Sequence, residues 1–403
     1  MPEGALSHIK VVDFTTHVAG PYCTKLLADY GAEVIKVERP GAGDAARHMG
    51  PFPGDIPHFE KSGLFLHLNT NKRSVTLDLK SKAGQKIARE LCQEVDLVVE
   101  SFRPGTMACF GLGFEELQSL NPLLVMTSIS NFGQTGPYRD YKTSDILVYS
   151  MGGEMNSTGL ADREPIKLGA NVVLYQAGSV AAVASAGALF LSQGDGTGQQ
   201  VDVSIMETQT GSIDRRMSAL IGYQYTGETS KRASPGSSGY PTGVYPCRDG
   251  YLEVTGGQTY LPRIVQAMGN PPELLDPKWY RPEAQTDLEL KLEFETHFLT
   301  WTLGQTKAEA WRAAQDAGVL SAALNTMEDL ANDRHFNGRG AFARIDHPAA
   351  GSLDYPGRPF IMSDSPWEIR RPAPLLGQHN SEILQELGYS REDVIRLRTL
   401  GVI

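Results

Sequence analysis

Short apolar runs alternate with amphipathic stretches through the first half of the chain. The apolar runs predict buried β-strands at residues 8–14, 32–38, 74–79, 96–102 and 123–130. Amphipathic segments at about 22–30 and 80–94 predict helices between them, and Gly31 is placed to end the first helix. Strands that alternate with helices form parallel sheets, so the pattern predicts a doubly wound α/β domain.

Residues 158–203 depart from this pattern. A loop leads into a helix of about 176–191 built from Ala, Ser and Gly, and a turn then leads to an alternating strand at 200–205. The 21 uncharged residues from 172 to 192 are just long enough to cross a bilayer. Because most of their side chains are small, we interpret the segment as a buried helix of a soluble protein and expect no membrane partner.

Beyond about residue 214 the pattern changes to loops, a hairpin and separate helices. An Arg-Asp-Gly turn predicts the hairpin at 244–254, and helices are expected at about 260–268, 283–302, 307–317 and 381–387. Ser390 and Asp393 are spaced as a capping box that opens a last short helix. We predict a Rossmann-like large domain at 1–224, a smaller α+β domain at 225–325, and a C-terminal segment at 326–403 that returns to the large domain.

Composition narrows the class of protein. The 403 residues are 41% hydrophobic and 21% charged, which is ordinary for a globular enzyme. The net charge of −10 and the lack of a dense basic run argue against nucleic-acid binding. The four cysteines are far apart and form no metal-binding pair, so we expect no metal and no disulfide framework. The first residues lack a signal-peptide pattern, which favours a reducing cytoplasm.

The turn after the first strand lacks the GxGxxG dinucleotide fingerprint. Glu38 ends the second strand, at the position where dinucleotide-binding proteins hold a ribose hydroxyl with an acid. Arg39 follows it, and a cation there suits a nucleotide that carries an extra ribose phosphate.

Five segments of the chain resemble one protein family. They read HVAGPYCTKLLADYGAEVIKVERPGAGDAAR, NKRSVTLDLK, ESFRPGT, TGQQVDVSIME and PLLGQHNSEILQELG. In this order and spacing the chain resembles, nearly end to end, the family III CoA-transferases. That family includes formyl-CoA transferase, carnitine CoA-transferase and the related α-methylacyl-CoA racemases.

The resemblance implies a reaction and an assembly. In the family, CoA moves from an acyl-CoA to a free carboxylate, and an Asp carboxylate attacks the thioester to form covalent intermediates. Acyl-CoA and a carboxylic acid are then the substrates. The family fold implies two subunits threaded through each other as interlocked rings, so the partner is a second copy of the chain or a homologous subunit.

The resemblance assigns contacts with CoA to His17, Val18, Arg39, Lys72, Ser101, Phe102 and Lys142. Each of these residues also has a purely structural explanation, as a solvated charge or a core side chain. Cys109 stands where formyl-CoA transferase has an Arg, so one charge contact is lost. Loops at 40–63 and 234–243 are expected to select the acceptor acid.

The family nucleophile has no equivalent in this chain. The family Asp lies four residues before a helix glycine that aligns with Gly178, and this position is Leu174. Tyr175 is a poor substitute, because it would need a strongly lowered pKa. The nearest carboxylates before the loop are Asp145 and Glu154.

Three hypotheses follow from this substitution. In the first, the chain is the nucleophile-free subunit of a heteromeric CoA-transferase, as in benzylsuccinate CoA-transferase, and a homologous subunit supplies the Asp. In the second, it is an active transferase, racemase or lyase that uses a displaced carboxylate. In the third, it binds CoA or acyl-CoA without any chemistry.

Overall fold

A computed structural model describes residues 4–211, 214–229, 231–232 and 239–403. They form two compact units. Unit 1 comprises Met1–Thr158, Pro165–Ser230 and Gly340–Ile403, and unit 2 comprises Gly159–Glu164 and Lys231–Arg339. Residues 234–238, half of the loop predicted at 234–243, lie outside the described residues.

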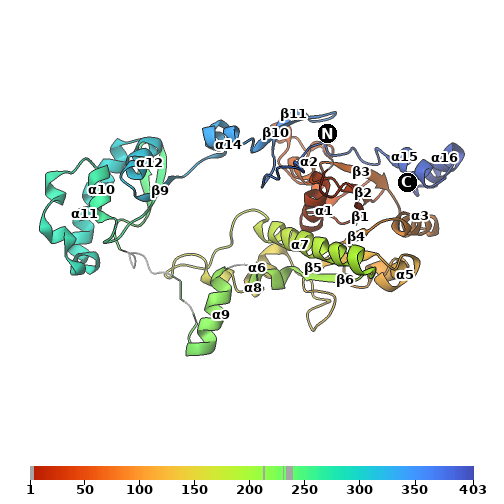
Figure 1. Cartoon of the computed structure of the whole chain (residues 1–403), viewed down its shortest axis with the longest axis horizontal. Helices are drawn as coiled ribbons and strands as arrows, with labels where there is room; N and C mark the ends of the chain where they lie inside the picture. Colours follow the sequence, from red (N-terminus) through yellow and green to blue (C-terminus); the bar gives the residue numbers. More distant parts are fainter. Residues whose placement is uncertain (1–3, 212–213, 230, 233–238) are drawn as a thin grey trace. The chain divides into compact units, whose positions relative to one another are not determined.

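Unit 1 is built on a six-stranded parallel sheet (Figure 1). Its strands are β1 (Lys10–Phe14), β2 (Glu33–Glu38), β3 (Lys72–Thr76), β4 (Leu97–Glu100), β5 (Val125–Ser130) and β6 (Gln200–Ser204). The strand order is β3-β2-β1-β4-β5-β6, and all neighbours run parallel. The predicted α/β fold with a parallel sheet is therefore confirmed. The winding reverses between β1 and β4, where loops diverge and leave a crevice at the carboxyl ends of the strands.

Helices and a hairpin surround this sheet. The helices of unit 1 are α1 (Ala19–Asp29), α2 (Gly63–Leu68), α3 (Lys82–Gln93), α4 (Thr106–Cys109), α5 (Phe114–Leu120), α6 (Asp145–Met151), α7 (Val172–Asp195), α8 (Ile205–Gly211), α9 (Asp214–Thr226), α15 (Asn380–Glu386) and α16 (Arg391–Thr399). Short 3-10 turns are η1 (Ala45–His48), η2 (Pro53–Asp55) and η3 (Met155–Ser157), and the hairpin is β10 (Phe342–His347) with β11 (Gly351–Pro356).

Both faces of the sheet are buried at its central strands, which explains the apolar runs of β1, β4 and β5. Successive residues of a strand point to opposite faces. Val11 packs in the same core as α1 and α7, whereas Val12 packs in the core that contains α3, α5, α15 and α16. Figure 1 shows α1 and α7 along one side of the sheet, and the two helices contact each other.

Unit 2 is a small α+β unit. Its antiparallel strands are β7 (Gly243–Cys247), β8 (Gly250–Thr255) and β9 (Leu320–Ala323). Its helices are α10 (Leu261–Ala267), α11 (Leu288–Gly304), α12 (Lys307–Asp316), α13 (Met327–Asn332) and α14 (Arg334–Gly338), with 3-10 turns η4 (Pro272–Leu274), η5 (Pro277–Tyr280) and η6 (Pro282–Thr286). Leu252, Trp279 and Phe294 lie at the centre of its core.

The structure differs from the sequence predictions at several elements. Helix α7 begins at Val172, four residues before its predicted start, so Leu174 lies in its first turn. Helix α9 and the hairpin β10–β11 were not predicted. The hairpin at β7–β8 and the capping box of Ser390 and Asp393 are both confirmed.

Among the described residues, α7 is the one helix that is long and apolar enough to cross a membrane. Half of its most apolar window is buried inside the structure. The interpretation of α7 as a core helix therefore rests on its packing against α1 and β5 rather than on its composition.

A glycine sets the distance between α1 and α7. A Cβ at Gly178 would lie 2.5 Å from the Ala19 carbonyl oxygen and 3.2 Å from the Tyr22 side chain. A Cβ at Gly187, on the same helix, would meet no atom within 4 Å. Only the first glycine is therefore required by helix packing.

We predict opposite stability effects for these two glycines. Gly178→Ala should lower the free energy of unfolding by about 1–3 kcal/mol, because the added methyl group pushes α1 away from α7. Gly187→Ala, the matched control, should raise it by about 0.5–1 kcal/mol through helix propensity. Denaturant unfolding of both variants tests this, and equal effects would contradict the close packing.

Candidate functional site

A large cavity of unit 1 lies where the sheet reverses its winding. It has a volume of about 570 Å³ and will be called the larger cavity. Its walls come from the turn after β1, the loops after β4 and β5, and the first turn of α7. The residues that line it are Thr16, His17, Val18, Ala19, Gly20, Ser101, Phe102, Arg103, Pro104, Thr106, Ile129, Ser130, Asn131, Arg139, Asp140, Tyr141, Lys142, Thr143, Leu174 and Ile205.

A second cavity of about 280 Å³, the smaller cavity, lies beside it at the ends of β2 and β3. Arg39 and Lys80 line it, and it shares Thr16 and Phe102 with the larger cavity. The two cavities therefore extend along the carboxyl edge of the sheet. Of the predicted CoA contacts, His17, Val18, Ser101, Phe102 and Lys142 line the larger cavity, and Arg39 lines the smaller one.

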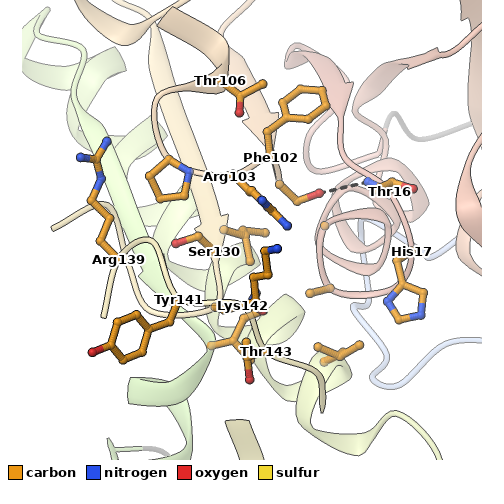
Figure 2. Close-up of a pocket in the computed structure, with 18 of the residues that line it drawn as sticks. Thr16, His17, Phe102, Arg103, Thr106, Ser130, Arg139, Tyr141, Lys142 and Thr143 are labelled. Carbon is orange, nitrogen blue, oxygen red and sulfur yellow. Dashed lines mark hydrogen bonds between the residues drawn. The ribbon is translucent and has the colours of Figure 1, made fainter. Parts of the chain in front are cut away.

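Side chains hold the turn between β1 and α1 in an unusual conformation. His17 has a φ of +74°, a left-handed value that costs a residue with a Cβ about 1–2 kcal/mol. Asp44 Oδ1 accepts hydrogen bonds from the His17 amide at 2.8 Å and from Thr16 Oγ1 at 3.0 Å. The Thr16 amide donates to Ser101 Oγ at 3.1 Å, the bond drawn in Figure 2.

Helix α1 begins at the wall of the larger cavity. Its N-cap residue, Val18, provides no side-chain cap, and Val18, Ala19 and Gly20 all line the cavity. The first amides of a helix and its dipole favour negative charge. This end of α1 therefore suits an anionic ligand group.

Three cations line the larger cavity. Among the described residues, the side chains of Arg103, Arg139 and Lys142 form no hydrogen bond or ion pair. Figure 2 shows Arg103 and Lys142 directed into the centre of the cavity, whereas Arg139 and Tyr141 lie along its far rim. Asp140 is the only carboxylate among the residues that line this cavity. The cavity is therefore electropositive and suits phosphate or carboxylate groups.

Lys72 lines neither cavity. Its ammonium group is fully buried and lies 3.0 Å from Asp13 Oδ2, 2.9 Å from the Pro21 carbonyl oxygen and 2.9 Å from Asn69 Oδ1. Burial opposes ionisation of Asp13, but Lys36 and Lys72 hold the pKa of its carboxyl well below its usual range. In this chain Lys72 thus supports the sheet under the turn after β1.

Leu174 contributes an apolar surface to the larger cavity and is 7% exposed. The candidate carboxylates lie elsewhere: Asp145 forms an ion pair with Lys167 at 2.8 Å, and Glu154 is buried and accepts from Thr158 Oγ1. Neither lines the larger or the smaller cavity. Burial raises the pKa of Tyr175, which disfavours a phenolate nucleophile.

Sequence reasoning missed several residues of the site. Arg103 directly follows the predicted Ser101 and Phe102, so its position was a usable signal. Arg139 and Tyr141 gave no comparable signal, because they lie in a loop whose path the sequence does not define. Asp44 was missed because it acts through backbone contacts 27 residues away. Among the described residues, no group of three or more His, Cys, Asp or Glu side chains is placed to hold a metal.

The crevice, its cations and the start of α1 suit a large anionic ligand. The chain belongs to CoA-transferase family III, whose sequence profile matches residues 6–380. CoA-transferases act on acyl-CoA, so coenzyme A is a substrate of this family and not a resident cofactor.

Individual relatives match over nearly their full lengths. The succinyl-CoA–D-citramalate CoA-transferase of Chloroflexus aurantiacus is 35% identical over 100% of this chain and 99% of its own. The BbsE subunit of the succinyl-CoA:(R)-benzylsuccinate CoA-transferase of Thauera aromatica is 33% identical over 98% of each chain. A CAIB/BAIF family protein from Brucella suis has a crystal structure with a TM-score of 0.82, at 27% identity over 96% of this chain and 100% of that one.

Glu100 supports the wall of the larger cavity. It ends β4, is 4% exposed, and its Oε2 accepts from the Phe102 amide at 2.7 Å. Burial raises the pKa of Glu100 to about 7. Hydrogen bonds from Ser128 and the Phe102 amide favour the ionised form and oppose this rise, but burial has the larger effect.

We predict that Glu100 makes stability fall with rising pH. The unfolded chain releases this proton near pH 4.5 and the folded chain only near pH 7, so the free energy of unfolding decreases between these values. The decrease should amount to at most about 3 kcal/mol. Urea unfolding at pH 5 and pH 8 should show this decrease in the free energy of unfolding for the wild type but not for Glu100→Gln. The exposed control Glu94→Gln should behave as the wild type, and a wild-type pH dependence retained in Glu100→Gln would contradict the assignment.

Proposed function

We propose that this chain is the nucleophile-free subunit of a heteromeric CoA-transferase. The observation that carries the proposal is the position of Leu174. Its side chain lines the larger cavity, at the place to which the family resemblance assigns the Asp nucleophile. An apolar side chain cannot attack a thioester, yet the cations around it are those that an acyl-CoA would need.

The two cavities fit the parts of coenzyme A. The smaller cavity lies beside Arg39 and Lys80 and suits the nucleotide with its ribose phosphate. The larger cavity, with Arg103, Lys142 and the start of α1, suits the diphosphate and the pantetheine arm. Thr16 and Phe102 border both cavities, so one extended ligand would contact both residues.

The proposed donor is succinyl-CoA, and the proposed acceptor is a carboxylic acid such as an aromatic succinate. Two relatives that match this chain end to end are named for succinyl-CoA, and one of them is a subunit of a benzylsuccinate enzyme. Arg139, at the far rim of the larger cavity, would face the second carboxylate of such an acid.

The proposed partner is a homologous subunit that carries the Asp. Its carboxylate would attack the thioester carbonyl and release the CoA thiolate, leaving a mixed anhydride. The thiolate would then attack the aspartyl carbonyl, release the donor acid and leave an enzyme thioester. The acceptor carboxylate would repeat these steps in reverse, receive CoA and restore the Asp.

Unit 1 exposes apolar side chains that suit such a partner. Val183 and Phe190 of α7 are 74% and 83% exposed, and Tyr225 of α9 is 85% exposed. A monomer rarely leaves large apolar side chains in water in such number without an interface. An interlocked dimer, as the family resemblance implies, would cover them.

All four cysteines are free thiols, which agrees with our placement of the protein in the cytoplasm.

We predict that Lys142→Ala weakens binding of CoA by roughly tenfold, because it removes a cation directed into the larger cavity. The dependence of affinity on salt concentration should also become weaker. Calorimetric titration with CoA at two salt concentrations measures both effects. Lys86→Ala is the control, because Lys86 lies on α3 and lines neither cavity, and an equal loss in both variants would contradict the site.

We predict that the chain alone transfers no CoA and that Leu174→Asp gains the first chemical step. Incubated with succinyl-CoA, the variant should form a hydroxylamine-sensitive acyl adduct at least roughly tenfold above Leu174→Asn, which has the same size and no nucleophile. Intact-mass spectrometry measures the adduct. Equal adduct in both variants would show that position 174 is not placed to react.

Co-purification from the native source tests the partner. The expected companion is a second family III chain with Asp at the position equivalent to Leu174, and the mixed complex should be active. Transferase, racemase or lyase activity of the wild-type chain by itself would overturn the proposal in favour of a displaced carboxylate. Binding of CoA with no activity in any complex would favour a protein that only binds CoA.

A further inference from the structure

The turn between β1 and α1 has its backbone fixed by side chains from distant segments. Three successive amides, at Thr15, Thr16 and His17, donate to Asp13, Ser101 and Asp44 respectively. These side chains come from β1, from the loop after β4 and from the loop after β2. The turn does not therefore hold its conformation by local bonds alone.

Asp44 contacts two successive residues of this turn. Its Oδ1 accepts from the His17 amide, from Thr16 Oγ1 and, at 2.8 Å, from the Ala46 amide. Its Oδ2 lies 2.8 Å from the Lys36 ammonium, and both side chains are fully buried. Lys36 also donates to the Thr15 carbonyl oxygen at 3.0 Å, so it contacts the carboxylate and the turn together.

We infer that Asp44, paired with Lys36, is a positioning residue that keeps His17 left-handed and thereby shapes the wall shared by the two cavities. The inference rests on the proposed function to the extent that this wall binds CoA. A residue with a Cβ leaves the left-handed region unless its neighbours compensate. Here the compensating interaction is the hydrogen bond from the His17 amide to the Asp44 carboxylate. The ion pair with Lys36 stabilises the negative charge of this carboxylate.

The consequence for binding is geometric. Thr16 borders both cavities, and His17 and Val18 line the larger one. If His17 returned to negative φ, the direction of the chain would change between Thr16 and the first turn of α1. The donors that face the ligand would then move, although the sheet beneath them stayed intact. Asp44 would not need to contact the reacting atoms to affect binding.

A double-mutant cycle between Asp44 and His17 tests this inference. The affinity for CoA is measured by calorimetry in the wild type, Asp44→Ala, His17→Gly, His17→Ala and both double variants. Asp44→Ala should weaken binding by about tenfold, the factor that corresponds to the lost compensation. Adding His17→Gly should recover at least threefold of this loss, because glycine adopts positive φ without a Cβ penalty. Adding His17→Ala, which keeps the Cβ, should recover nothing.

Hydrogen exchange supplies a readout that needs no ligand. The peptide that contains residues 15–22 should exchange faster in Asp44→Ala than in the wild type. Asp96→Ala is the matched control, because Asp96 accepts a hydrogen bond from the Lys10 amide at 2.8 Å. This bond lies at the amino end of β1, away from the turn. This control should change neither the exchange of the turn nor the affinity for CoA.

The outcomes are separable. An Asp44→Ala effect of the same size in all three His17 backgrounds, or unchanged exchange in the turn, would overturn the inference. A wild-type chain that does not bind CoA would overturn the proposed function, while the exchange experiment would still decide the role of Asp44. If Asp44→Ala is insoluble, Asp44→Asn replaces it in the cycle. It keeps the volume and one acceptor oxygen, and it should show the same coupling to His17 at a smaller size.

Discussion

Four charged side chains with no solvent contact, Asp13, Lys36, Asp44 and Lys72, support the binding face of unit 1. Charges withdrawn from water are tolerated only as pairs, and removal of one partner from a buried pair typically costs about 3–5 kcal/mol. The four residues come from β1, β2, β3 and the loop after β2. The pairs therefore connect three strands and the turn above them. They hold the strand ends at the base of the crevice and the turn at its rim in a fixed arrangement.

In the proposed function, binding and chemistry are located on separate elements. The cations and amides that suit CoA come from loops at the carboxyl ends of the strands, whereas position 174 lies on α7. Leu174 packs in the core between α7 and the sheet, so an apolar residue there leaves no polar atom unsatisfied and no ion pair broken. The proposed loss of the nucleophile would thus require no loss of fold or of the proposed ligand site. A subunit with this arrangement would keep a wall for the ligand while a partner supplies the reactive group.

The hydrophobic pattern was sufficient to predict the sheet, because strands buried on both faces leave long apolar runs at β1, β2, β4 and β5. It failed at α9 and at β10–β11, where the sequence has no clean periodicity. Lys72 shows a different limit. The family resemblance assigned it to CoA, yet in this chain its ammonium group pairs with Asp13 beneath the turn. Residues that act across long sequence separations, such as Asp44 on His17, leave no local pattern and required coordinates.

The apolarity of α7 also has a consequence for synthesis of the chain. A newly made segment of this length and hydropathy resembles the substrates of the membrane-insertion machinery. However, α1 and β5, which both pack against it, are translated before Val172 leaves the ribosome. A domain that folds from its N-terminus can therefore offer α7 a docking surface as soon as it emerges. The order of elements along the gene thus protects the helix that most needs protection.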